Sequence, residues 1–119
     1  MSHSSQDVHK KILGKKGERL AEKFLLGLGY QLIAKNYRTP FGEADLIFLY
    51  GDETVFVEVK TRSSTAYGTP REAVTYDKQE RYRKIALYYG QQTRTEVNAR
   101  FDVVEVYQNG KIEHYPFAF

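Results

Sequence analysis

Two apolar segments that follow each other closely, residues 43–50 and 54–62, constrain the fold of this chain most strongly. Alternate residues of a strand share a face. In residues 45–50 both alternating sets are mainly apolar, and in residues 54–62 one set contains Val55, Val57 and Val59. A strand that is apolar on both faces is covered on both faces. Gly51-Asp52 between the segments marks a tight turn. The two segments therefore predict a central hairpin in a sheet that other elements cover on each side.

The other elements are predicted from the spacing of apolar residues and from turn signals. Apolar residues recur at helical spacing from Lys10 to Leu28 and from Thr75 to Gln91, and Thr75 is a good N-cap. Further strands are predicted over residues 30–38, 100–107 and 111–115. The order helix, three strands, helix, two strands predicts an α/β sandwich with a mixed five-stranded sheet flanked by helices.

The length of 119 residues fits one domain, which we place at residues 10–119 after a flexible polar leader of residues 1–9. The absence of cysteine excludes disulfides, thiolate zinc sites and a cysteine nucleophile. No apolar run has the length of a membrane span, and the first residues do not resemble a signal peptide. We therefore expect a cytoplasmic protein that does not bind a membrane.

Three charged residues interrupt the apolar hairpin. Asp45 lies in its first strand, Glu58 and Lys60 share one face of its second strand, and the turn places Asp45 nearly opposite Glu58. Two close carboxylates repel each other, but they suit a Mg²⁺ ion that polarises a phosphate and activates water. A neighbouring lysine can stabilise the charge of the transition state. The set predicts a metal-dependent centre for phosphodiester hydrolysis, although Glu58 and Lys60 could instead form a salt bridge on a half-exposed sheet.

Basic residues concentrate in the two predicted helices, although the net charge of +3 is mild. Such clusters suit phosphate contacts, and solvated helix faces explain them equally well. The residues that we predict to contact nucleic acid are Lys10, Lys11, Lys15, Lys16, Arg19, Lys78 and Arg81.

The motifs in this order resemble the PD-(D/E)xK signature of restriction-endonuclease-like nucleases. The chain more closely resembles the bacterial YraN family, whose biochemical role is poorly defined, and is similar more distantly to archaeal Holliday junction resolvases. The matching stretches, within about residues 14–106, are Gly17-Glu18, Ala21-Glu22, residues 42–47, residues 56–60, Lys78-Gln79 and residues 100–104. The resemblance implies a restriction-endonuclease-like three-layer sandwich, Mg²⁺ or Mn²⁺ as cofactor, and a possible homodimer.

The resemblance also implies roles for single residues. Asp45 and Glu58 match the acids that bind the metal, and Lys60 matches the catalytic lysine. Glu18 matches an acid of the first helix that assists the metal site, and Gln79 matches a polar helix residue near the same site. Where the signature has proline this chain has alanine at position 44, although the core of the signature needs only the aspartate.

The residues themselves leave alternatives open for the supporting positions. Glu18 lies at the edge of the apolar arc of its helix and could simply reach water, and Gln79 could be a hydrogen-bonding core residue. Glu43 shares a face with Asp45, so it could be a third metal contact or could end the strand in solvent. We assign Glu43 a supporting role.

Three functions compete. The first is a metal-dependent endonuclease acting on DNA, which we favour over RNA, with branched or structured DNA as one possible substrate. The second is a nucleic-acid-binding module with little catalysis, and the third is a protein adaptor on the same fold. The complete set of Asp45, Glu58 and Lys60 favours the first, because a pure binding module has no need of two repelling carboxylates.

Overall fold

The computed structural model describes residues 5–62 and 75–119. It contains two helices and five strands in the predicted order, which are α1 (Ser5–Gly27), β1 (Gln31–Thr39), β2 (Gly42–Tyr50), β3 (Glu53–Arg62), α2 (Tyr76–Thr93), β4 (Ala99–Tyr107) and β5 (Ile112–Tyr115). Helix α1 begins at Ser5 and so includes part of the predicted leader, because the apolar arc that marked its start gives no signal in a polar first turn. Within the described ranges, neither helix is long and apolar enough to cross a membrane.

The five strands form one mixed sheet in the order β1-β2-β3-β4-β5. Strands β3 and β4 are parallel and the other neighbours are antiparallel, so the prediction of a mixed five-stranded sheet is confirmed. The predicted central hairpin is β2–β3, with Leu46 opposite Val57 and Tyr50 opposite Glu53 at the turn. The pairing confirms the register inferred from the turn at Gly51-Asp52.

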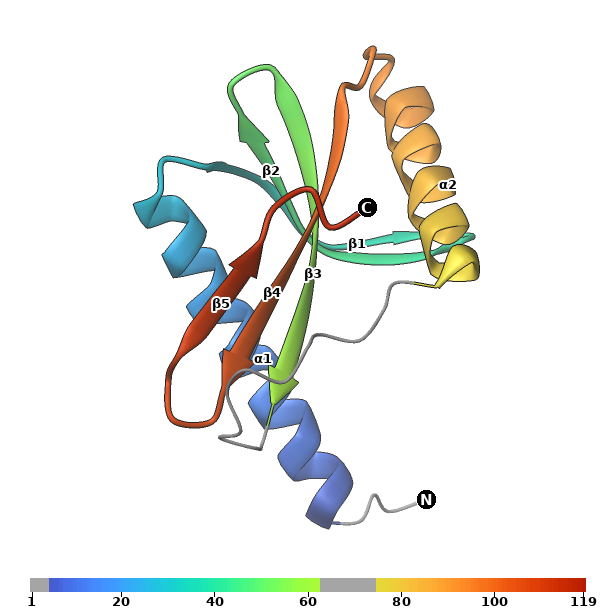
Figure 1. The fold of residues 1–119 in the computed structure, drawn as a ribbon. Coiled ribbons are helices and arrows are strands. Elements are labelled where there is room, and N and C mark those ends of the chain that lie inside the picture. The colour runs from blue at the N-terminus through green and yellow to red at the C-terminus, as the bar shows by residue number, and fades with distance from the viewer. Residues whose placement is uncertain (1–4, 63–74) are drawn as a thin grey trace.

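One helix packs on each face of the sheet (Figure 1). On one face, Ala21 and Leu25 of α1 pack against leucine, phenylalanine and valine side chains of β2, β3 and β4. On the other face, Tyr82, Ile85 and Ala86 of α2 pack against β2 and β3. These two cores account for the apolar character of both faces of the central strands. The architecture is therefore an α/β sandwich whose central sheet is covered on both sides.

The N-terminus of α2 forms as its sequence indicates. Thr75 has an extended backbone, and its hydroxyl oxygen accepts a hydrogen bond from the Lys78 backbone N–H at 3.2 Å. Asp77 in the first turn adds a favourable charge at the positive end of the helix dipole. This cap fixes where α2 starts, and with it the position of Lys78 over the sheet.

Candidate functional site

The candidate site begins where strands β2 and β3 separate. Their backbone pairing extends to Leu46 and Val57, and the next position would place Asp45 opposite Glu58. Here the Val59 N–H donates a hydrogen bond to Asp45 Oδ2, at 2.8 Å, and not to a backbone carbonyl oxygen of β2. The side chain of Asp45 is thus fixed against β3, next to Glu58, as the predicted hairpin register requires.

Glu58 has one partnered and one unpartnered oxygen. Its Oε1 lies 2.5 Å from the Nζ atom of Lys78 on α2, and both side chains are mostly buried. Its Oε2 is buried and has no hydrogen-bond partner among the residues that the structure describes. A buried carboxylate oxygen without a partner is costly and is a usual mark of a position for a cation or an ordered water. Lys78 therefore belongs to the acidic centre, whereas the sequence predicts it only as a phosphate contact.

The surroundings of Asp45 disfavour its negative charge. Burial raises the pKa of Asp45 from 3.8 to about 6, and the carboxylates of Glu18, Glu58 and Glu43 contribute to the rise, while the hydrogen bond from Val59 works in the opposite direction. The structure therefore brings near Asp45 all three of the other acids that the sequence predicts for the centre. A carboxylate held in this state gains from a cation at its free oxygen.

Tyr82 of α2 faces the same acids. Its ring is buried in the core, and its pKa is raised first by burial and then by the charges of Glu58 and Asp45. The charges of both carboxylates therefore act on the Tyr82 hydroxyl group of α2. The apolar stripe of α2 predicts Tyr82 only as a core residue, and nothing in the sequence indicates that its hydroxyl group faces two acids.

Asn36 of β1 links the two outer acids. In the amide orientation that satisfies its hydrogen bonds, its side-chain nitrogen donates to Glu43 Oε1 at 2.9 Å and to Glu18 Oε1 at 3.2 Å. Asn36 has a positive φ of 51°, a conformation that asparagine tolerates better than most residues. Asparagine is uncommon inside strands, and that is the one signal in the sequence that could have indicated a special position.

Glycine at position 17 allows α1 to carry Glu18 to this centre. Gly17 is buried, and a Cβ atom there would lie 2.3 Å from the Thr61 Cγ2 atom of β3. No side chain fits in that space, so α1 approaches the sheet closely at this turn. The close approach places the next residue, Glu18, within reach of Asn36 and of the charge of Asp45.

Lys60 lies beside a buried acid that the sequence analysis does not predict. In the parallel pairing of β3 with β4, Lys60 is opposite Glu105. The Glu105 side chain is almost fully buried, and its Oε2 accepts a hydrogen bond from Arg62 Nε at 2.7 Å. Within the described ranges, its Oε1 has no hydrogen-bond partner. The half-buried Lys60 therefore lies between the Asp45–Glu58 pair and a second carboxylate.

These acids provide the ligand chemistry for a hard divalent cation. All the candidate donors are carboxylate oxygens, which suit Mg²⁺ and Mn²⁺. In the part of the chain that the structure describes, no group of three or more Asp, Glu or His side chains is arranged closely enough to hold a metal ion. Mg²⁺ is commonly bound through one or two carboxylates together with phosphate oxygens of the substrate. Asp45 and Glu58, with the unpartnered Glu58 oxygen, fit that kind of site.

The predicted basic residues lie on both helices. Lys15, Lys16 and Arg19 are exposed on α1, and Arg81 is exposed on α2, so the two sets belong to helices on opposite faces of the sheet. The side chains of Lys10 and Lys11 lie outside the described residues. Gln79 follows Lys78 in the first turns of α2 and is half-buried.

A second charged cluster lies apart from the acidic centre. Arg100 donates two hydrogen bonds to Asp102, at 2.9 and 2.7 Å, and also contacts Glu53 and Tyr30. His114 Nε2 lies 2.8 Å from Asp102 Oδ2. Asp102 is thus a sheet residue with polar partners, and the network connects β4 to β5 and to the residue just before β1.

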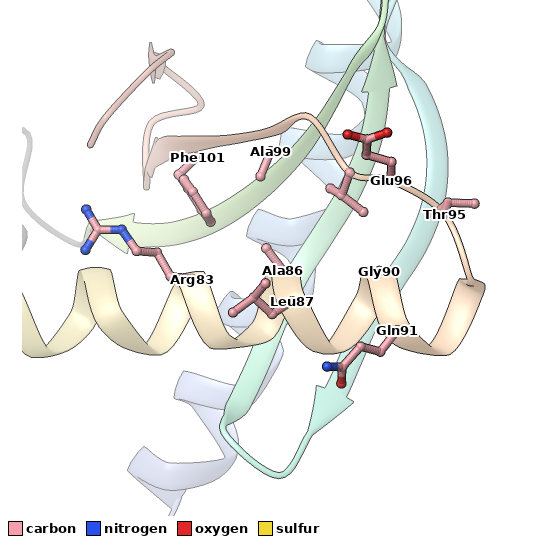
Figure 2. Close-up of a pocket in the computed structure, with 10 residues that line it drawn as sticks. Arg83, Ala86, Leu87, Gly90, Gln91, Thr95, Glu96, Ala99 and Phe101 are labelled. Carbon is pink, nitrogen blue, oxygen red and sulfur yellow. The ribbon is translucent and has the colours of Figure 1, made fainter.

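A cavity of about 630 Å³ lies beside the C-terminal half of α2. Figure 2 shows Ala86, Leu87 and Gly90 of α2 lining it from one side and Ala99 and Phe101 of β4 from the other. Its lining is mainly apolar and contains none of the acids of the candidate centre. The cavity is therefore separate from the chemistry that the carboxylates support.

Comparison with known proteins identifies the family. The sequence matches the uncharacterised protein family UPF0102 over residues 17–106. A UPF0102 protein of Thermodesulfovibrio yellowstonii is 47% identical over 107 residues, which cover 90% of this chain and 95% of the relative. UPF0102 proteins of Alkaliphilus oremlandii and Rhodococcus opacus are 47% and 44% identical and cover 94% of this chain and 100% and 99% of their own lengths. The YraN-like resemblance of the sequence is confirmed, and this chain belongs to the UPF0102 family.

Proposed function

We propose that this protein is a metal-dependent endonuclease of the restriction-endonuclease-like type, which hydrolyses phosphodiester bonds of DNA. The observation that carries the proposal is the buried, unpartnered oxygen of Glu58 next to Asp45, whose pKa is raised to about 6. A fold does not retain two such carboxylates on one face for stability alone, because each is more stable when its charge is compensated. A divalent cation compensates both at once.

Each residue of the candidate centre has its own role in the proposed hydrolysis. Asp45 and Glu58 would hold Mg²⁺ or Mn²⁺, which supplies a Lewis acid and a water of lowered pKa when bound. Lys60 lies two residues after Glu58 in β3, where its ammonium group can stabilise the negative charge that develops on the phosphate. Glu18 and Glu43, held by the Asn36 amide, support the centre by fixing its electrostatic field. Gln79 completes the predicted set from α2.

Lys78 has a second role in this proposal. Its ammonium group already neutralises Glu58 Oε1 in the metal-free protein. Binding of a metal to Glu58 would weaken that ion pair, and the released lysine would then be available to a phosphate oxygen at the same place. In the metal-free protein, the Lys78 ammonium group thus compensates the charge of the partly buried Glu58 until metal and substrate bind.

The test compares Asp45→Asn and Lys60→Ala with the wild-type chain. Mn²⁺ affinity is measured by calorimetry, and cleavage is measured on a panel of linear, single-stranded and branched DNA. Asp45→Asn should weaken metal binding and lower cleavage by orders of magnitude. Lys60→Ala should keep most of the metal affinity and still lose cleavage, since lysine is not a ligand. Glu96→Gln, an exposed acid in the segment before β4, is the matched control and should change neither property.

One observation favours the alternative of a nucleic-acid-binding module with little catalysis. The Lys78–Glu58 ion pair already compensates one of the two acids without any metal. The alternative is supported if the wild-type protein binds DNA, shows no heat of Mn²⁺ binding in calorimetry and has the same Tm with and without Mn²⁺. The nuclease proposal then fails.

A further inference from the structure

The turn between β1 and β2 carries an exposed aromatic ring close to the candidate centre. Phe41 is 44% exposed, although it is one of the large apolar residues of the chain. Isolated exposed apolar residues are common and need no explanation by themselves. The turn around this ring and the charges beside it set Phe41 apart from the others.

The turn is built to hold its shape. The Thr39 hydroxyl donates to the Gly42 carbonyl oxygen at 2.8 Å, and its oxygen accepts from the Phe41 N–H at 3.1 Å. Pro40 restricts the backbone just before the ring. Gly42 has a φ of 137°, which residues with side chains rarely adopt. Phe41 is therefore presented on a fixed support.

One cationic side chain lies over the ring, and two more lie close to the turn. The Nζ atom of Lys84 lies 5.8 Å from the centre of the Phe41 ring. The Tyr88 ring lies edge-on to the Phe41 ring, with 6.4 Å between the two ring centres. The side chain of Arg81 packs over Gly42. Arg38, just before the turn, is 87% exposed and makes a 3.5 Å contact with Glu43. We call this set of Arg38, Phe41, Arg81, Lys84 and Tyr88 the turn platform.

The turn platform adjoins the acidic centre. Figure 1 shows the turn between β1 and β2 beside the first part of α2, the helix that also supplies Lys78. Asp45 is three residues beyond Gly42 in β2, a separation of about 10 Å along an extended strand. A nucleic-acid strand whose phosphate lay at Asp45 would pass the turn platform within a few nucleotides.

We propose that the turn platform binds an unpaired nucleotide of a DNA strand, with Phe41 stacked on the base and Arg38, Arg81 and Lys84 contacting phosphates. An aromatic ring flanked by cations is the combination that binds single-stranded nucleic acid, since every base has a face for stacking and every nucleotide carries a negative charge. Arg38, Arg81 and Lys84 all carry a positive charge, so a negatively charged strand matches the turn platform better than a protein partner of mixed charge does. The inference rests on the proposed nuclease function and gives it a substrate class, DNA with unpaired bases next to the cleaved bond.

The first test uses the absence of tryptophan from the chain. Phe41→Trp introduces a single fluorescent reporter on the turn platform, and a single-stranded DNA oligonucleotide added in EDTA should quench it by stacking. Leu87→Trp, at a site that is 66% exposed on the far part of α2, is the control and should not respond. Emission from Phe41→Trp that stays unchanged at saturating DNA overturns the proposal, as does quenching by single-stranded RNA alone.

The second test measures affinity without metal. Phe41→Ala should bind the single strand about tenfold or more weakly, the usual effect of losing one stacked base, and should bind an intact duplex as the wild type does. Lys84→Gln should lower the slope of log affinity against log salt by about 0.7, whereas Lys23→Gln on α1 should not change it. Wild-type affinity of Phe41→Ala for the single strand overturns the proposal.

The two proposals fail in different ways. Because binding is measured in EDTA, quenching of Phe41→Trp with no Mn²⁺-dependent cleavage leaves the turn platform standing and removes the nuclease. Cleavage by the wild type that is equally efficient in Phe41→Ala on a substrate with unpaired bases leaves the nuclease standing and removes the turn platform.

Discussion

Replacing Asp45 by asparagine should make the metal-free protein more stable at neutral pH. Burial and the nearby carboxylates raise the pKa of Asp45 from 3.8 to about 6. A carboxyl group whose pKa is higher in the folded state holds its proton more tightly there, so its contribution to stability is complete below pH 3.8 and is lost as the pH rises to about 6. A difference of one in pKa between the folded and unfolded states corresponds to about 1.4 kcal/mol, so full ionisation of Asp45 destabilises the fold by about 3 kcal/mol.

The asparagine side chain would carry no charge and would still offer an oxygen to the Val59 N–H, whose hydrogen bond Asp45 Oδ2 now accepts at 2.8 Å. The free energy of unfolding of Asp45→Asn should therefore exceed that of the wild type by up to about 3 kcal/mol above pH ~7. For a domain of this size, that difference is on the order of 10 °C in Tm. Below pH ~4 the difference should disappear, because the wild-type carboxyl group is then protonated as well.

The measurement is urea unfolding in EDTA at a series of pH values, for the wild type, Asp45→Asn and the exposed control Glu96→Gln. Saturating Mn²⁺ should reverse the order of stability, because only the wild type keeps both metal-binding acids. A difference that does not vary with pH would refute the reasoning. An Asp45→Asn protein that is less stable than the wild type at neutral pH would show that Asp45 is an ordinary stabilising partner in the sheet.

Three further predictions concern the surroundings of the centre. Lys78→Gln should tighten Mn²⁺ binding in calorimetry by about fivefold, because the competing cation is removed and a partly exposed ion pair is worth about 1 kcal/mol; unchanged affinity would exclude competition. Gly17→Ala should destabilise the fold by about 1–3 kcal/mol in urea unfolding, since its Cβ would overlap the Thr61 Cγ2 atom. Adding Thr61→Ser removes that atom and should recover the lost stability. Asp102→Asn should cost about 3–5 kcal/mol, because the buried Arg100 would keep its 3.2 Å contact with Glu53 but would lose the carboxylate that it binds through two atoms, and an effect within error would contradict that account. Burial opposes the charge of Asp102, but hydrogen bonds from His114 and Arg100 hold its pKa below 3.8, so the stabilisation persists above that pH and is lost only as the pH falls through the lowered pKa.

The central hairpin, and the position of Asp45 opposite Glu58 in it, could be predicted because a strand has a period of two and a tight turn sets the register. Counting back from Gly51-Asp52 places Asp45 opposite Glu58, and the observed pairing of Leu46 with Val57 agrees. The contribution of α2 could not be predicted in the same way. The helical period gives the inward side of α2, but it does not say over which strand residues Lys78 and Tyr82 lie, because that depends on how the helix packs across the sheet.

The partly buried Asp45 and the buried Asp102 show how a structural acid differs from an acid of the candidate site. Asp45 and Asp102 both lie in apolar strands, but the residue two positions earlier on the same strand face is the acid Glu43 for Asp45 and the cation Arg100 for Asp102. Asp102 accepts hydrogen bonds at both oxygens from Arg100 and others, and its pKa is lowered. Asp45 receives one backbone hydrogen bond and faces further carboxylates, and its pKa is raised. The fold thus compensates one buried acid completely with its own side chains. At the other it leaves negative charge that a cation from solution can compensate, which is the physical argument for placing the chemistry at Asp45 and Glu58.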